Sequence, residues 1–189
     1  ESRVQIGKHG DVLALGQRTL EILDTPGHAR HHISIVDHAA RGVFSGDTFG
    51  LSYRELDVDG KAFIFPTTTP VNFEPEAMHA SIELMRSFKP AGIYLTHYSR
   101  VTEVDKLAED LHRHIDAFVT MTNQAPGDGD ARKQAIETAM TAYLLKEVRA
   151  HGCTLPDDEI KAIFATDLDL NAQGLAYWKQ QEEKKAASA

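Results

Sequence analysis

The sequence has one cysteine, no long apolar run and fewer basic than acidic residues. Its 189 residues include 20 lysines and arginines against 28 aspartates and glutamates, which gives a formal net charge of −8. A surface of this sign disfavours nucleic acids and anionic membranes, so we expect neither as a partner. No apolar run approaches the ~20 residues that cross a bilayer. The sequence therefore predicts no membrane span, and no signal peptide is visible.

Cys153 is the lone cysteine, so no disulfide can form within the chain. Low cysteine use suits a reducing compartment, and we expect a cytoplasmic protein. Hydrophobic residues make up 42% and charged residues 25% of the chain, as in ordinary globular proteins. This length predicts one domain with room for an appendage. Because the chain begins at Glu1 without a methionine, we expect a processed or trimmed product or a fragment.

The first hundred residues contain short strands separated by turns. Runs of five or six residues punctuated by Gly, Pro and Asp predict strands at 11–15, 18–23, 32–37 and 42–47. An irregular, aromatic-rich stretch follows at 50–74, and loops of this length are often functional. Apolar residues at steps of three and four then predict a helix from Pro75. A buried strand is expected at 92–97.

Beyond residue 100 the periodicity indicates helices only. We expect one helix over 104–118 and a second that starts at Asp130 as its N-cap. A third would begin with Thr154 as N-cap and Pro156 in its first turn, and a fourth would cover 171–183. The chain therefore divides into a mixed part, 1–100, and a helical extension, 101–189.

Three polar residues lie at or just after the ends of predicted strands. His28 comes after a Thr-Pro-Gly turn, Asp47 after Ser-Gly, and His97 ends the strand GIYLT. Strand ends hold side chains rigidly while one side stays open to a ligand. Two histidines and a carboxylate suit zinc, iron or manganese better than calcium or magnesium. Turn chemistry and backbone hydrogen bonding are the alternative explanation for all three.

The amino-acid sequences of these stretches resemble those of a known family. DTPGHARHHISIVD (24–37), GVFSGDTF (42–49) and GIYLTH (92–97) are similar, in this order, to motifs in the C-terminal half of the metallo-β-lactamase superfamily. The resemblance covers about residues 11–100. It implies an α+β fold that is the C-terminal half of an αββα sandwich, followed here by the all-helical extension.

The resemblance also implies roles for individual residues. His28 would be the third imidazole on a first metal ion, Asp47 would bridge two metals and take part in catalysis, and His97 would bind the second ion. His32 matches a frequent family histidine that supports a ligand or packs. We expect His31 at the surface. Residues expected to line a substrate pocket are Tyr53, Tyr98 and Arg100.

One family signature is absent from these 189 residues. No His-x-His-x-Asp-His string occurs, although it supplies two ligands to each metal in the family. A site with three of about seven ligands should bind zinc weakly. The αββα sandwich also needs its first half to cover apolar faces. We therefore expect a missing N-terminal half of the same polypeptide, and an inactive chain on its own. The helical extension would close over the pocket or build a homodimer interface.

The implied function is metal-dependent hydrolysis of a small molecule. Two zinc ions, or iron or manganese, would lower the pKa of a shared water, and the metal-bound hydroxide would attack a carbonyl or phosphoryl centre. The substrate classes are ester, thioester, lactone and phosphoester. Two alternatives remain open: a mononuclear iron dioxygenase of the same superfamily, and a non-catalytic module that keeps the fold.

Overall fold

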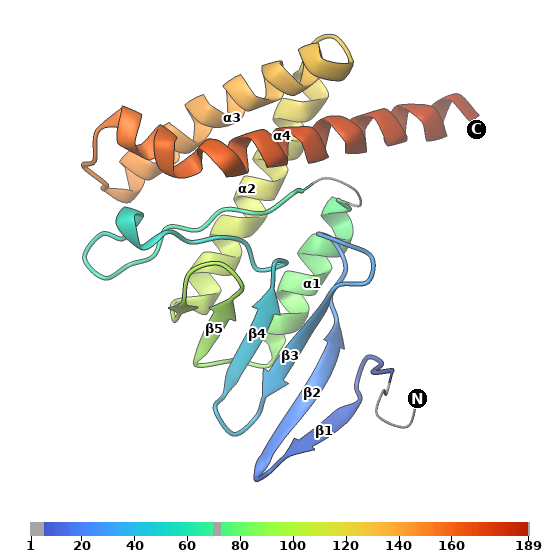
Figure 1. Ribbon diagram of the computed structural model, residues 1–189, viewed down its shortest axis with the longest axis vertical. Coiled ribbons are helices and arrows are strands. Elements are labelled where there is room, and N and C mark those ends of the chain that lie inside the picture. Colours follow the sequence, from blue (N-terminus) through green and yellow to red (C-terminus); the bar gives the residue numbers. More distant parts are fainter. Residues whose placement is uncertain (1–5, 70–72, 189) are drawn as a thin grey trace.

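The computed structural model describes residues 6–69 and 73–188. Within these residues the chain forms one six-stranded sheet and four α-helices (Figure 1). The strands lie side by side in chain order: β1 (Val12–Leu15), β2 (Arg18–Asp24), β3 (Ile33–Asp37), β4 (Gly42–Gly46), β5 (Gly92–Leu95) and β6 (Arg100–Val101).

The direction of the strands determines which strand ends meet. All neighbouring pairs are antiparallel except β4 and β5, which are parallel. The connection between that pair contains α1 (Pro75–Ser87), as expected for a crossover between parallel strands. Consequently β2, β4 and β5 run in the same direction, and their C-terminal ends lie at one edge of the sheet.

One face of the sheet packs against α1. Leu23 of β2 and Val43 of β4 are fully buried on this face, as are Ile82 and Met85 of the helix. Ser34 of β3 donates a hydrogen bond to the Met85 sulfur at 3.4 Å. Each fully buried side chain of this size contributes about 1.5–3 kcal/mol. This layer contains the strands predicted from short runs and the helix predicted from apolar residues at steps of three and four.

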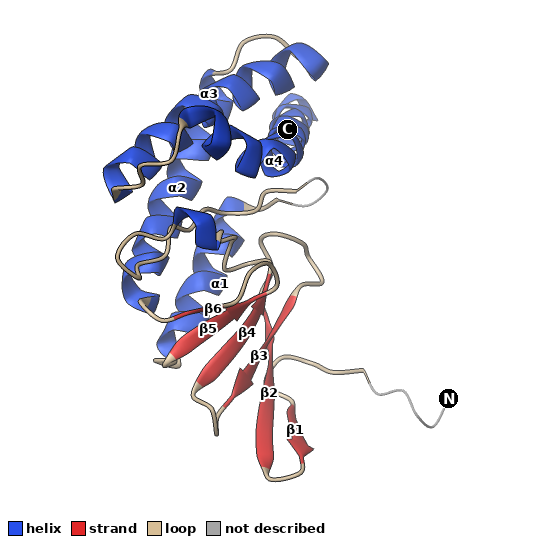
Figure 2. Cartoon of the chain, turned by 60° about the vertical axis from the view of Figure 1, so that its left-hand side comes forward, coloured by secondary structure: helices blue, strands red, loops and turns tan. Residues whose placement is uncertain are grey.

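The opposite face of the sheet carries an apolar row. Direct register partners share a face, and Ile22, Ile35, Phe44 and Tyr94 are paired in this order across β2–β5. Phe44 is 45% exposed, and its ring stacks on that of Tyr94 with centroids 4.9 Å apart. Figure 2 shows α1 and α2 on the other side of the sheet. Ile22 is buried, with Gly7 close to its side chain, whereas the rest of the row has no helix over it in the described part of the chain (Figure 2).

The helical end of the chain differs from the expected four helices. It contains α2 (Val104–Gln124), α3 (Gly129–His151) and α4 (Asp157–Ser188). The third and fourth expected helices are one helix of 32 residues, because no proline or turn sequence interrupts the segment. Thr154 is not an N-cap, since α4 begins directly after Pro156. The N-cap of α3 is Asp128, two residues before the expected one.

The core is continuous between the sheet and the helices. Phe65 from the stretch after β4 packs against Phe164 of α4 with ring centroids 5.0 Å apart, and both are buried. That stretch is mostly irregular, as expected; it includes a short 3₁₀ turn at Arg54–Leu56, and 70–72 lie outside the described residues. The short strand β6 was not predicted. None of the described helices is long and apolar enough to cross a membrane.

Candidate metal-ligand site

His28, Asp47 and His97 meet at one edge of the sheet. Each follows the C-terminal end of a strand, β2, β4 and β5 respectively. Because these three strands run in the same direction, residues distant in sequence come together there. The edge faces the helical part of the molecule (Figure 1).

The Asp47 carboxylate lies between the two imidazoles. His28 Nε2 is 3.7 Å from Oδ2, and His97 Nε2 is 3.2 Å from Oδ1. Each oxygen therefore faces a different ring, which is the arrangement that a carboxylate shared by two cations requires. Oδ1 is buried and makes no hydrogen bond within the described residues, because His97 Nε2, although 3.2 Å away, does not meet the angles that a hydrogen bond requires. A buried carboxylate oxygen without a partner is costly, so a cation at this position would compensate it.

These residues supply only part of a ligand set. In residues 6–69 and 73–188, no group of three or more His, Cys, Asp or Glu side chains is arranged to hold a metal ion. His28 with Asp47, and His97 with Asp47, would each give one nitrogen and one oxygen to a cation. That donor chemistry fits zinc, but tetrahedral zinc needs further ligands.

The neighbours of His28 allow the tautomer that leaves Nε2 free for a metal. The Thr67 hydroxyl donates to the Asp47 carbonyl at 3.2 Å and lies 2.8 Å from His28 Nδ1. With its proton on that carbonyl, the hydroxyl accepts from Nδ1, which is the tautomer that a metal at Nε2 would require. The lone pair of His28 is then on Nε2, the nitrogen that faces Asp47. Metal-binding imidazoles are commonly oriented by a hydrogen bond of this kind.

His32 contacts the backbone of Asp47 and does not face the candidate site. Its Nε2 accepts the Asp47 backbone N–H at 2.9 Å, and its Nδ1 is within 3.0 Å of the hydroxyls of Thr25 and Thr48. Burial lowers the pKa of His32, and the neighbouring His28 acts in the same direction. Both ring nitrogens are engaged, so neither is available to a metal. Gly46 allows this contact, because a Cβ there would lie 2.3 Å from Nε2.

A cavity of about 550 Å³ opens over the three residues. Tyr53 and Tyr98 line it, as expected from the sequence. The Tyr53 hydroxyl donates to Asp167 Oδ2 of α4 at 2.6 Å. The complete lining comprises His28, Asp47, Leu51, Tyr53, Thr67, Thr69, His97, Tyr98, Thr166, Asp167, Leu170 and Asn171.

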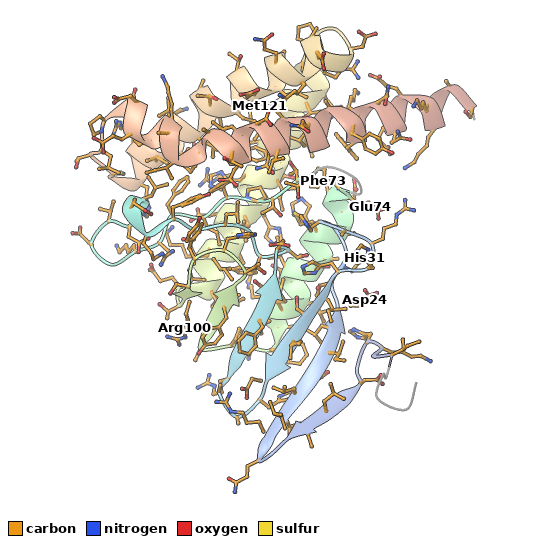
Figure 3. The ribbon with its side chains drawn as sticks, in the orientation of Figure 1. Asp24, His31, Phe73, Glu74, Arg100 and Met121 are labelled. Atoms are coloured by element: carbon orange, nitrogen blue, oxygen red, sulfur yellow. The ribbon has the colours of Figure 1, made fainter. Side chains whose placement is uncertain are left out.

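Arg100 does not line the cavity, so this expectation was wrong. Its guanidinium donates to the carbonyl of Ala91 at 2.7 Å and lies 5.9 Å from the centre of the Tyr94 ring. The reason is the pairing of β6 with β5, which directs Arg100 toward the start of β5 (Figure 3). His31 is exposed, as expected.

Residues of α4 at the cavity were not predicted from the sequence. Burial raises the pKa of Asp167, against the opposing effects of the Tyr53 hydroxyl and of His97. Burial also raises the pKa of Tyr53, with Asp167 contributing. The spacing of Phe164, Asp167, Asn171 and Gly174 along one helix face was the available signal, since it places an aspartate and an asparagine among apolar residues.

Comparison with known proteins gives the same fold. Residues 6–97 match the family model of the metallo-beta-lactamase superfamily. An archaeal metallo-beta-lactamase superfamily protein from Sulfolobus tokodaii superposes with a TM-score of 0.54 at 21% identity, covering 92% of this chain and 52% of that one. A metallo-beta-lactamase family protein from Thermus thermophilus gives 0.57 at 14% identity, covering 93% and 48%. Residues 6–97 are therefore similar to the metallo-β-lactamase superfamily, and the predicted fold class is confirmed.

The curated relatives are matched over a shorter stretch. A hydroxyacylglutathione hydrolase from Bradyrhizobium sp. (strain BTAi1) is 45% identical over 40 residues, which are 21% of this chain and 16% of that protein. The enzyme of the same name from strain ORS 278 matches equally well. The chain thus spans a small part of these relatives and about half of the two solved structures.

Proposed function

We propose that the chain is the C-terminal part of a metal-dependent hydrolase, with His28, Asp47 and His97 as metal ligands. The observation that carries this is the position of the Asp47 carboxylate. One oxygen faces each imidazole, and the buried Oδ1 makes no hydrogen bond in the described structure. Turn chemistry alone gives no reason for two imidazoles to converge on one carboxylate from separate strands.

The remaining ligands would come from a segment outside these 189 residues. Two observations support this. The chain covers 52% and 48% of the two solved structures. In addition, the apolar row of Ile22, Ile35, Phe44 and Tyr94 lies on the face that the second sheet of an αββα sandwich would cover. The same segment would complete both the core and the metal site.

The chemistry would be hydrolysis of a small molecule held in the cavity. A bound pair of cations supplies a water of lowered pKa and polarises the scissile bond. The chain's own groups orient the site: Thr67 directs His28 Nε2 inward, and His32 fixes the backbone of Asp47. Of the ester, thioester, lactone and phosphoester classes, the short match to a hydroxyacylglutathione hydrolase favours a thioester.

The test is Asp47→Ala, in this chain and in the longest polypeptide that its gene encodes. We expect zinc in the longer product by elemental analysis, and thioester hydrolysis in a panel of the four substrate classes. The variant should lose hydrolysis and bind zinc at least about tenfold more weakly, while its circular dichroism stays unchanged. Asp105→Ala, which removes an exposed carboxylate of α2, is the matched control and should behave as the parent.

Three outcomes would contradict the proposal. Unchanged turnover in Asp47→Ala would remove this residue from the site. Bound iron with oxygen consumption would favour a dioxygenase instead. Absence of metal from both products would return His28, Asp47 and His97 to turn and packing roles.

A further inference from the structure

One face of α4 is directed at the loops that carry the candidate ligands. Phe164, Asp167, Asn171 and Gly174 are spaced by three, four and three residues, so they lie on the same side of the helix. Phe164, Asn171 and Gly174 are buried. This face contacts the segment Pro66–Thr68 and the side chain of Tyr53. Thr67 in that segment contacts His28, and Tyr53 contacts Tyr98, the residue after His97.

Asn171 fixes the segment that orients His28. Its Oδ1 accepts the Thr68 backbone N–H at 2.7 Å, and its Nδ2 donates to the Pro66 carbonyl at 3.1 Å. These bonds hold the residues on both sides of Thr67, whose hydroxyl lies 2.8 Å from His28 Nδ1. A buried amide with both of its groups satisfied holds the backbone in one arrangement.

Asp167 acts on the turn that carries His97 through two tyrosines. It accepts the Tyr53 hydroxyl at 2.6 Å, and the Tyr53 ring lies against the Tyr98 ring with centroids 4.6 Å apart. Tyr98 directly follows His97. The stack therefore connects α4 to the backbone of the turn.

This turn needs support from outside itself. Tyr98 and Ser99 have φ values of 72° and 79°, the left-handed region that costs residues other than glycine about 1–3 kcal/mol each. Within the turn, the Leu95 N–H donates to the Ser99 carbonyl at 3.1 Å. The His97 side chain is 51% exposed, so its own packing fixes it weakly. A strained conformation persists only when surrounding contacts hold it.

We propose that α4 positions both imidazoles of the site, with Asn171 acting on His28 and Asp167 acting on His97. The inference rests on the proposed function, because it assumes that these imidazoles bind metal. It assigns the helical extension a role in the site: Asp167, Tyr53 and Asn171 are positioning residues, and none of them is a metal ligand. The effect of Asp167 on His97 is easier to test than the effect of Asn171 on His28. It depends on one hydrogen bond, between Asp167 and Tyr53, and one ring contact, between Tyr53 and Tyr98.

The experiment measures zinc affinity by competition with a chromophoric chelator. Variants Asp167→Ala and Tyr53→Phe should each bind zinc about tenfold more weakly than the parent. Asp167→Asn should bind nearly as the parent does, because its amide oxygen still accepts the Tyr53 hydroxyl. Asp169→Ala is the matched control: this carboxylate of the same helix contacts Lys133 and Gln173, and its loss should leave zinc affinity unchanged.

A second measurement separates this inference from the metal proposal. Hydrogen exchange of the Leu95 amide reports the turn directly and needs no metal. It should be faster in Asp167→Ala and Tyr53→Phe and restored in Asp167→Asn. If His97→Ala weakens zinc binding but Asp167→Ala and Tyr53→Phe do not, the inference is overturned and the metal proposal stands. If the parent binds no zinc through His97, the metal proposal fails, and unchanged exchange rates would overturn the inference as well.

Discussion

Single histidines show how the surroundings of a residue decide its chemistry. His28 and His97 face a carboxylate at the open edge of the sheet, whereas His114 of α2 is buried and its Nδ1 lies 2.8 Å from the Tyr143 hydroxyl. Burial lowers the pKa of His114 to about 4, and the neighbouring Arg113 acts in the same direction. His114 is therefore neutral at pH 7.

The free energy of unfolding should depend on the titration of His114. Its pKa is lower in the folded chain than the ordinary value of 6.5, so the unfolded chain binds the proton more tightly. The stability contributed by neutral His114 is complete above pH 6.5 and decreases as the pH falls toward 4, by about 3 kcal/mol in total. Urea unfolding at pH 7.5 and 5 measures this. In His114→Gln the loss between these pH values should be smaller; an equal loss would contradict the pKa assignment.

At this scale the sequence predicted which polar residues converge better than it predicted which residues line the cavity. Strand ends and short motifs placed His28, Asp47 and His97 at positions that the structure brings together. Arg100 was misplaced because the direction of a side chain depends on strand pairing, and the two-residue strand that carries it leaves little pattern. Asp167 was not predicted because its role depends on where a distant helix packs.

At the scale of secondary-structure elements, α4 is the helix whose bounds the sequence predicted least well. The sequence predicted a break before Asn171, but the helix continues through Gly174. The structure explains this glycine by packing: a Cβ at position 174 would lie 1.7 Å from the Thr68 carbonyl oxygen. Strands and α1 were predicted well, because their apolar periodicity reflects burial on one face. A close approach between backbones leaves no such periodic signal.

Gly174→Ala tests this contact. Alanine is more favourable than glycine inside a helix by about 1 kcal/mol. If helix propensity were the sole effect, the substitution would therefore stabilise α4. We expect the opposite, a loss of about 1–3 kcal/mol in the free energy of unfolding, because the methyl group would push the helix from the Pro66–Thr68 segment. Chemical denaturation measures the sign. Ala162→Gly, at an exposed position of the same helix, calibrates the propensity effect; a stabilised Gly174→Ala would contradict the described packing.

At the scale of the whole molecule, the sheet has one buried apolar face and one that is only partly covered, where Ile22 is buried but Phe44 is exposed. Exposed apolar surfaces of this kind mark contacts with another layer or partner. We expect the isolated chain to bind a hydrophobic dye and to self-associate through this face, and Phe44→Lys to reduce both. Sedimentation velocity and dye fluorescence provide the measurement. Tyr177→Lys, which replaces an exposed aromatic residue of α4, is the control and should change neither; an unaltered Phe44→Lys would show that the face is inert.

The contacts of α4 also determine when during synthesis the site can form. Asn171 hydrogen-bonds residues that precede it by 103 and 105 positions. A ribosome produces the sheet, with His28, Asp47 and His97, well before it produces this helix, and chains generally fold from the N-terminal side. The nascent chain therefore carries its candidate ligands on loops that lack their support until residue 171 has left the exit tunnel. Arresting translation at successive lengths should show the Leu95 amide becoming protected only after that point.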